Sequence, residues 1–62
     1  MNLDEFKGLN VDETVDALKA VYPDMVINKV PNTAFVTMDY RLDRLRVYYS
    51  EETNKVTSVK NG

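Results

Sequence analysis

Few side chains in this sequence could perform catalysis. Its 62 residues include no Cys and no His, so disulfides and thiolate metal sites are excluded, and carboxylates are the only plausible metal ligands. Ser50 and Ser58 have no recognisable base as a partner. A chain this short also leaves little room for a ligand pocket of the usual ~300 Å³ or more. We therefore predict that the protein is not an enzyme and that it uses no metal and no cofactor.

The most unusual residues lie in one long polar segment. Residues 33–46 read TAFVTMDYRLDRLR, with Met38 in a polar surrounding and two arginines, Arg44 and Arg46, at alternate positions. Side chains two residues apart on a strand share one face of a sheet. The simplest interpretation is an irregular connection in which Met38 fills the core and the arginines are solvated. Against this interpretation, unstructured loops of about a dozen residues are uncommon in compact domains and are often functional.

The sequence predicts one helix before this segment. Asn10 is a good N-cap, and Glu13 follows at the spacing of a capping box. Pro23 disfavours helix at the residue before it, so we predict one helix over about residues 11–21. An apolar stripe at helical spacing should face the core, and it consists of Val11, Val15, Leu18, Val21 and Tyr22.

Two predicted strands flank the segment, and a third follows. Residues 25–30, MVINKV, are rich in β-branched side chains, and Pro31 ends them. Residues 45–50, LRVYYS, form the second strand. Because strand side chains alternate, one face would present Leu45, Val47 and Tyr49, and the other Arg44, Arg46 and Tyr48. Asn54 suits a left-handed turn position, so residues 56–59 could form a short strand antiparallel to the second.

The composition indicates one globular domain over residues 1–62, with residues 1–9 as an irregular arm anchored by Leu3 and Phe6. The apolar fraction of 44% is ordinary, and the net charge of −2, from 8 basic and 10 acidic residues, does not favour nucleic-acid binding. No run approaches the ~20 apolar residues that a membrane span needs. The acidic first residues do not resemble a signal peptide, and they indicate no compartment. We expect a soluble monomer.

Residues 36–46, VTMDYRLDRLR, resemble the reactive-site region of the potato inhibitor I family of serine protease inhibitors. The family pattern is Val-Thr-Met-acidic-Tyr-Arg-aliphatic-Asp-Arg-aliphatic-Arg, and this sequence agrees with it in type at every position. Pro31 lies seven residues before Met38, as it does in the family. The resemblance covers nearly the whole chain. It implies an α/β (α+β) fold, in which one helix packs on a small mixed sheet and a long reactive loop connects two parallel strands.

The resemblance also implies a partner, a serine protease, and it assigns roles to loop residues. The bond that the protease attacks would be Met38–Asp39. Met38 would enter the primary specificity pocket, and its long apolar side chain suits subtilisin- or chymotrypsin-like enzymes better than an acidic trypsin-type pocket. Neighbouring subsites would be contacted by Phe35, Val36, Thr37, Tyr40 and Arg41. The implied function is reversible, substrate-like inhibition.

A loop without disulfides needs another source of stiffness, because stiffness lowers the ordering cost of binding. By resemblance, Arg44 and Arg46 would hydrogen-bond beneath the loop to Thr37 and Asp39, and the carboxylate of Gly62 would help to hold the arginines. Charge-assisted bonds of this kind are roughly twice as strong as neutral ones. They would also keep the leaving amine in place after cleavage, so that the acyl-enzyme religates instead of hydrolysing.

Three sites depart from the family pattern. Leu3 and Asp4 stand where the family usually has Trp-Pro, and residues 59–62 read VKNG where it has Pro-Arg-Val-Gly. Thr33 and Ala34 stand where the loop normally begins with Gly followed by Thr or Ser. Threonine does not take the positive φ values open to glycine, so the base of the loop must differ if such a conformation is needed there. An alternative is therefore a diverged or engineered variant of the scaffold with weak or no inhibitory activity.

Overall fold

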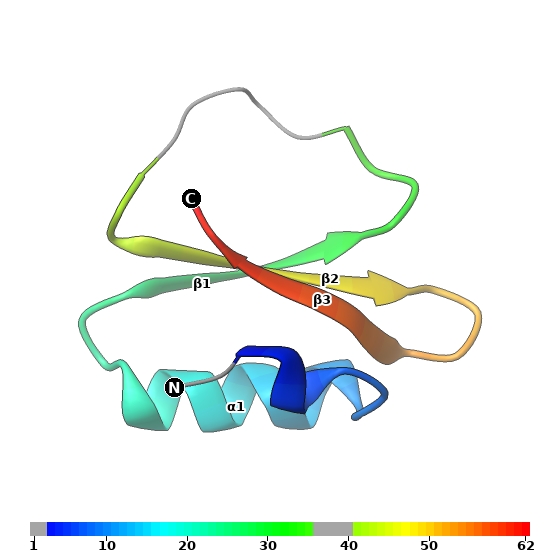
Figure 1. Cartoon of the computed structure of the whole chain (residues 1–62), viewed down its shortest axis with the longest axis horizontal. Helices are drawn as coiled ribbons and strands as arrows, with labels where there is room; N and C mark the ends of the chain where they lie inside the picture. Colours follow the sequence, from blue (N-terminus) through cyan, green and yellow to red (C-terminus); the bar gives the residue numbers. More distant parts are fainter. Residues whose placement is uncertain (1–2, 36–40) are drawn as a thin grey trace.

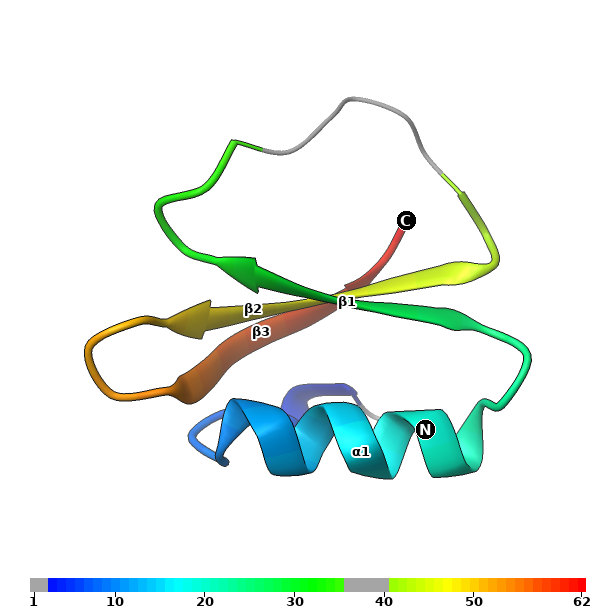
Figure 2. The ribbon, with the colours of Figure 1, turned by 180° about the vertical axis from the view of Figure 1, so that it is seen from behind.

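The computed structural model describes residues 3–35 and 41–62, which form two layers (Figure 1). The elements in chain order are the 3-10 helix η1 (Leu3–Phe6), the helix α1 (Val11–Val21) and the strands β1 (Val26–Pro31), β2 (Arg44–Ser50) and β3 (Lys55–Asn61). Figures 1 and 2 show that α1 lies against one face of the sheet, whereas residues 32–35, after β1, and residues 41–43, before β2, lie on the opposite side of the sheet. This arrangement confirms the predicted α+β fold, with one helix on a small sheet.

The helix α1 begins and ends where the local sequence signals predict. The Asn10 side-chain oxygen accepts hydrogen bonds from the backbone N–H groups of Asp12, at 2.9 Å, and Glu13, at 3.1 Å. These bonds satisfy two of the N–H groups that the first turn of a helix leaves unpaired. At the other end, the N–H of Tyr22 donates to the Leu18 carbonyl at 2.8 Å, and Pro23 follows.

The apolar stripe of α1 faces the sheet, with one exception. Val11, Val15 and Leu18 are buried, and Tyr22 packs against them. Val21 is 52% exposed, so the prediction that it faces the core was wrong. The reason is helical geometry: Tyr22 takes the inward position four residues after Leu18, and Val21 is turned outward. Thr14 is buried instead, and its hydroxyl donates to the Asn10 carbonyl at 2.9 Å.

The sheet has the order β1-β2-β3, in which β1 and β2 are parallel and β2 and β3 are antiparallel. The parallel register runs from Val26 opposite Arg44 to Pro31 opposite Tyr49. This finding confirms the parallel pair implied by the family resemblance. Parallel neighbours need a crossover connection, and here residues 32–43 provide it without a helix among the residues that are described.

The two faces of the sheet differ in character. On the α1 side, Leu45 and Val47 are buried and Tyr49 packs against them, as the alternation predicts. The opposite face of β2 carries Arg44 and Arg46. The core cluster also contains two residues of β3, Val56 and Val59. Strict alternation would not bury both, but the register shifts between Tyr48 and Tyr49, so that Tyr48 pairs with Ser58 and Tyr49 with Val56.

The N-terminal arm is more regular than predicted. Residues 3–6 form η1, and the arm then pairs with the start of β3: the N–H of Gly8 donates to the Val56 carbonyl at 2.8 Å, and the N–H of Val56 donates to the Leu9 carbonyl at 2.8 Å. Gly8 has φ +84°, a conformation that favours glycine. Phe6 packs against the core as predicted, whereas the side chain of Leu3 lies outside those described.

Asn54, in the turn before β3, has φ +55°, which confirms its predicted left-handed conformation. Across residues 3–35 and 41–62, no helix is long and apolar enough to cross a membrane.

Candidate functional site

The candidate reactive loop connects the far end of β1 to the start of β2. Its predicted scissile bond, Met38–Asp39, and the predicted contact residues Val36, Thr37 and Tyr40 lie outside the described residues. The structure describes both sides of the loop, which we call the ascending stem (residues 32–35) and the descending stem (residues 41–43). It also describes the sheet face beneath them. The described part of the site therefore consists of the two stems and the residues that hold them in place.

Backbone hydrogen bonds fix the ascending stem. The N–H of Asn32 donates to the Tyr49 carbonyl at 2.9 Å, and this bond continues the pairing of β1 and β2 by one residue. The N–H of Ala34 then donates to the Pro31 carbonyl at 2.9 Å, which closes a tight turn. Among the described non-glycine residues, only Asn54 has a positive φ, so neither Thr33 nor Ala34 has one. The base of the loop thus turns without a left-handed residue at the two positions where the family pattern has Gly and Thr or Ser.

Side chains tie the same stem to the rest of the sheet. The Thr33 hydroxyl donates to Glu51 Oε1 at 3.1 Å, and the Thr57 hydroxyl donates to Asn32 Oδ1 at 2.9 Å. Glu51 follows β2 and Thr57 lies in β3, so the stem is bonded to both halves of the hairpin. A threonine in place of glycine therefore gains a contact that glycine could not make.

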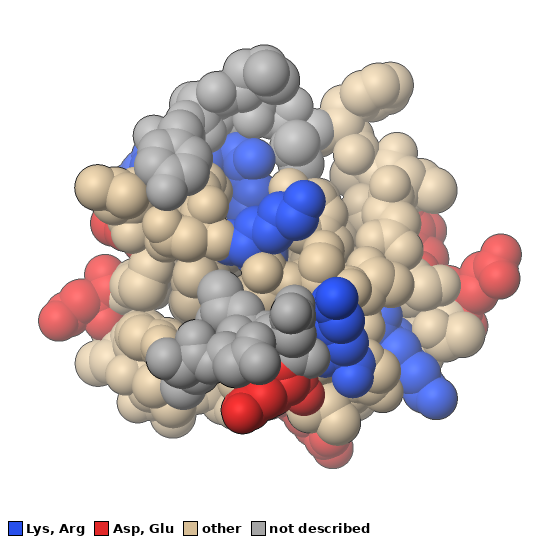
Figure 3. Space-filling view, viewed as in Figure 1, with Lys and Arg blue, Asp and Glu red and all other residues tan. Residues whose placement is uncertain are grey.

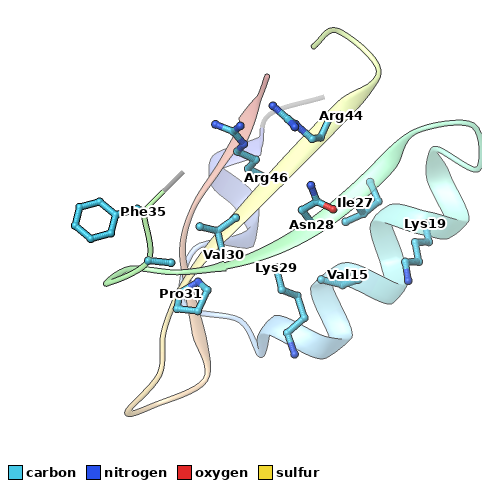
Figure 4. A pocket seen from close by; sticks show the side chains of 11 residues that line it. Val15, Lys19, Ile27, Asn28, Lys29, Val30, Pro31, Phe35, Arg44 and Arg46 are labelled. Carbon is cyan, nitrogen blue, oxygen red and sulfur yellow. The ribbon is translucent and has the colours of Figure 1, made fainter. Parts of the chain in front are cut away.

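The side chain of Phe35 ends the ascending stem and is fully exposed, at 104% of the reference area. In Figure 4 its ring points away from the strands. Leu42, on the descending stem, is 75% exposed. Single exposed apolar side chains are common on proteins, but here two of them lie on the two stems of one loop.

The descending stem contains a two-pronged ion pair. Arg41 Nε donates to Asp43 Oδ1 at 3.0 Å, and Arg41 Nη2 donates to Asp43 Oδ2 at 2.7 Å. Both side chains are about half exposed. The Arg41 hydrogen bond lowers the pKa of Asp43 below its ordinary value of 3.8, and the charges of Arg41 and Arg44 act in the same direction. The carboxylate is therefore ionised at neutral pH, and it holds Arg41 in one orientation.

Arg44 is the buried cation of the site. The residue is only 7% exposed, and its Nε donates to the main-chain oxygen of Gly62 at 2.8 Å. The N–H of Gly62 in turn donates to the Arg44 carbonyl at 2.9 Å. Gly62 has φ +142°, in the region that favours glycine. The resemblance implied that Gly62 lies near the loop-supporting arginines, and the structure places it in a reciprocal pair with Arg44.

Arg46 projects from the same face of β2 as Arg44 (Figure 4) and is half-buried. Their predicted partners, Thr37 and Asp39, lie outside the described residues. Figure 3, viewed as in Figure 1 with α1 below the sheet, shows basic side chains near the middle of the molecule. Two guanidinium groups on one face offer many N–H donors, so the arrangement suits acceptor groups on a loop above it.

A hollow of about 490 Å³ lies beside β1, lined by strand residues 27–31, two side chains of α1, the ascending stem and the two arginines (Figure 4). Most of it is open to solvent, so it is a groove on the surface and not an enclosed ligand pocket. Four of the lining side chains are basic and none is acidic: Lys19, Lys29, Arg44 and Arg46. Within the described residues, no three Asp, Glu, His or Cys side chains gather in a way that could hold a metal ion.

Sequence reasoning missed the polar contacts that hold the two stems, among them those of Asn61. Asn61 Nδ2 donates to the Leu42 carbonyl and to the Arg44 carbonyl, each at 3.2 Å. These partners lie 19 and 17 residues away in the sequence. No local pattern signals such a contact, because it depends on the register of β3 against β2.

Comparisons with known proteins agree on the family. The model of the potato inhibitor I family matches residues 4–59. Eglin C from Hirudo medicinalis is 34% identical over 55 residues, which cover 89% of this chain and 79% of that protein.

Two solved structures share the fold. The crystal structure of bitter gourd trypsin inhibitor has a TM-score of 0.81 at 19% identity, covering 94% of this chain and 85% of its own. The structure of the elastase inhibitor AFUEI has a TM-score of 0.72 at 22% identity, and the match covers 97% of this chain and 82% of that chain. At these identities the two structures support the fold alone. The family match and the relative together show that the chain belongs to the potato inhibitor I family and is a protease inhibitor, not an enzyme.

Proposed function

We propose that this protein is a reversible, substrate-like inhibitor of subtilisin- or chymotrypsin-type serine proteases, and that it presents the Met38–Asp39 bond. The observation that carries the proposal is the reciprocal pair of Arg44 and Gly62 beneath the loop. A nearly buried arginine is expensive to desolvate. Its placement on the loop side of the sheet, away from the apolar cluster, is explained if it supports the loop.

Arg44 can support the loop because its own orientation is fixed. The bond from Nε to Gly62 sets the plane of the guanidinium, and therefore the direction of its other donors. Thr37 and Asp39 flank Met38 and offer a hydroxyl and a carboxylate as acceptors. A loop bonded on both sides of the scissile bond loses little further freedom when a protease binds, so less of the contact energy is spent on ordering it.

The same supports would make inhibition reversible. The serine of the protease attacks the Met38 carbonyl carbon, the bond to the Asp39 nitrogen breaks, and that nitrogen leaves as an amine after taking a proton. If the amine stays beside the ester, it attacks the ester carbon, re-forms the peptide bond and returns the proton to the serine oxygen. A free peptide would diffuse away, and water would then hydrolyse the ester.

The choice of target follows from Met38 and Phe35. Methionine is long, unbranched and apolar, so it fits an apolar primary pocket and leaves the carboxylate of a trypsin-type pocket without a partner. Phe35, three residues earlier and fully exposed in the free protein, would add an apolar contact on the acyl side.

The test is a titration of subtilisin, chymotrypsin and trypsin with the protein, following residual activity and the site of any cleavage. We expect stoichiometric inhibition of the first two enzymes, with slow cleavage only after Met38. Met38→Lys should move inhibition towards trypsin. The control variant Val21→Lys introduces a lysine at a half-exposed position on the distant helix α1, and it should not move inhibition towards trypsin. Rapid digestion of the loop without inhibition would refute the proposal.

A further inference from the structure

The strand β3 ends in a residue that reaches the descending stem of the loop. Asn61 pairs with Leu45 in the β2–β3 register, and its amide group lies across the start of β2. There Nδ2 donates to the Leu42 carbonyl and to the Arg44 carbonyl, both at 3.2 Å. One side-chain amide thus bridges two carbonyls of the chain as it leaves the loop.

The bond to Leu42 lies beyond the end of the regular sheet. Arg44 is the first residue of β2, so the Leu42 carbonyl is not part of the strand ladder. The Leu42 side chain is 75% exposed and adds little packing of its own. The Arg41–Asp43 ion pair spans the same residue, but it joins two parts of the stem to each other. The N–H of Val26 donates to the Asp43 carbonyl at 2.8 Å and joins the last residue of the stem to β1. The bond from Asn61 ties the stem to β3 one residue nearer the loop, at Leu42.

We propose that Asn61 is a positioning residue that retains the leaving-group side of the loop. The inference rests on the proposed function. After a protease opens the Met38–Asp39 bond, the new amino terminus begins at Asp39, three residues before Leu42. A bond that holds the Leu42 carbonyl limits how far this short end can move from the ester on Met38. Asn61 therefore favours religation over hydrolysis without touching the protease or the reacting atoms.

Two substitutions at this position test the proposal. Asn61→Val keeps a side chain that suits a strand but has no donor. Asn61→Asp keeps the shape and places an acceptor against two carbonyls. For either variant we expect the rate of cleavage after Met38 and the cleaved-to-intact ratio at equilibrium to rise about three- to tenfold, the range for losing the one hydrogen bond to Leu42 that holds the stem. The increase should be closer to tenfold for Asn61→Asp than for Asn61→Val.

The comparison variant is Thr57→Val, which removes a hydrogen bond from the same strand to Asn32 on the ascending stem. That stem belongs to the acyl side, which stays covalently attached to the protease after cleavage. Thr57→Val should therefore leave the cleavage rate and the cleaved-to-intact ratio close to those of the parent, even if it lowers the urea midpoint of unfolding as much as Asn61→Val does.

A second measurement does not depend on any protease. Amide hydrogen exchange of residues 41–43 in the free protein should be faster in Asn61→Val than in the parent or in Thr57→Val. If the parent fails to inhibit, the proposed function falls. If the parent inhibits and Asn61→Val matches Thr57→Val in cleavage and in exchange, Asn61 is only a structural residue and this inference is wrong.

Discussion

Replacement of Arg44 by lysine is the most direct test of how the loop is held. The substitution keeps a positive charge in the same place but removes the planar donor set. A lysine ammonium cannot reproduce the direction of the Nε bond to Gly62, which measures 2.8 Å, and cannot serve several acceptors in one plane. The fold should survive, because the apolar cluster lies on the other face of the sheet.

The size of the effect follows from burial. Arg44 is 7% exposed, so solvent screens its hydrogen bonds only slightly. A hydrogen bond from a charged group contributes about 1.5–3 kcal/mol, and about 1.4 kcal/mol corresponds to a tenfold change in an equilibrium constant. If the loop must be ordered at the moment of binding instead of beforehand, this energy is subtracted from affinity. We expect the inhibition constant to rise about 10- to 100-fold.

The assay compares the inhibition constant for subtilisin with the urea midpoint of unfolding, for the parent, Arg44→Lys and Arg46→Lys. Arg46 is half-buried, so the same change there should weaken inhibition less. Faster amide exchange of Phe35 and Arg41, on the two stems, should accompany the loss of inhibition. An unchanged inhibition constant in Arg44→Lys, with the fold intact, would refute the view that a guanidinium orders the loop.

Four further predictions concern other parts of the molecule. Leu18→Ala should destabilise by about 2–5 kcal/mol, because Leu18 is 0% exposed; this equals most of the ~3–5 kcal/mol expected for so small a core, so urea unfolding should begin near zero denaturant. Asn10→Ala should cost about 1 kcal/mol in the same assay through loss of two capping bonds, and a change within error would show that water replaces the cap. The Asp43 carboxyl should titrate below 3.8 by NMR, since its pKa is lowered in the folded state. The ion pair with Arg41 is therefore complete above that pH and is lost as pH falls through the folded-state pKa; a midpoint at or above 3.8 would contradict the ion pair. Phe35→Ala should weaken inhibition without lowering stability, because the ring is fully exposed in the free protein; an equal loss of stability would mean that it packs on the scaffold.

Local signals predicted the helix closely and the strands within two residues. Asn10 and Pro23 bracket α1 because capping and the geometry before proline act over three or four residues. The alternation of Leu45 and Val47 with the arginines likewise predicted the two faces of β2. Neither signal specifies which strands are neighbours, and here the parallel pairing of β1 and β2 was implied by the family resemblance alone.

The features that the sequence did not predict involve distant partners. The register shift opposite Tyr48 and Tyr49 buries Val59 along with Val56, because one extra residue of β3 reverses the alternation after it. The bond between Asn61 and Leu42 joins the last residue of β3 to a residue just before β2, so the two lie far apart in the sequence but together at the open end of the hairpin. Such contacts follow from how the hairpin is aligned, and a β-branched run such as VTSV is compatible with more than one alignment.

The two-layer design separates the stability of the fold from the stiffness of the loop. The apolar cluster lies between α1 and one face of the sheet, whereas the supports of the loop are polar: Arg44 with Gly62, Thr33 with Glu51, Thr57 with Asn32, and Asn61 with Leu42. Hydrogen bonds depend on direction, and apolar packing does not. Each of these polar contacts can therefore fix the orientation of a stem while contributing little to the free energy of unfolding. Substitution of Arg44 should weaken inhibition and substitution of Asn61 should speed cleavage, each with little effect on unfolding, whereas substitutions beneath α1 should do the reverse.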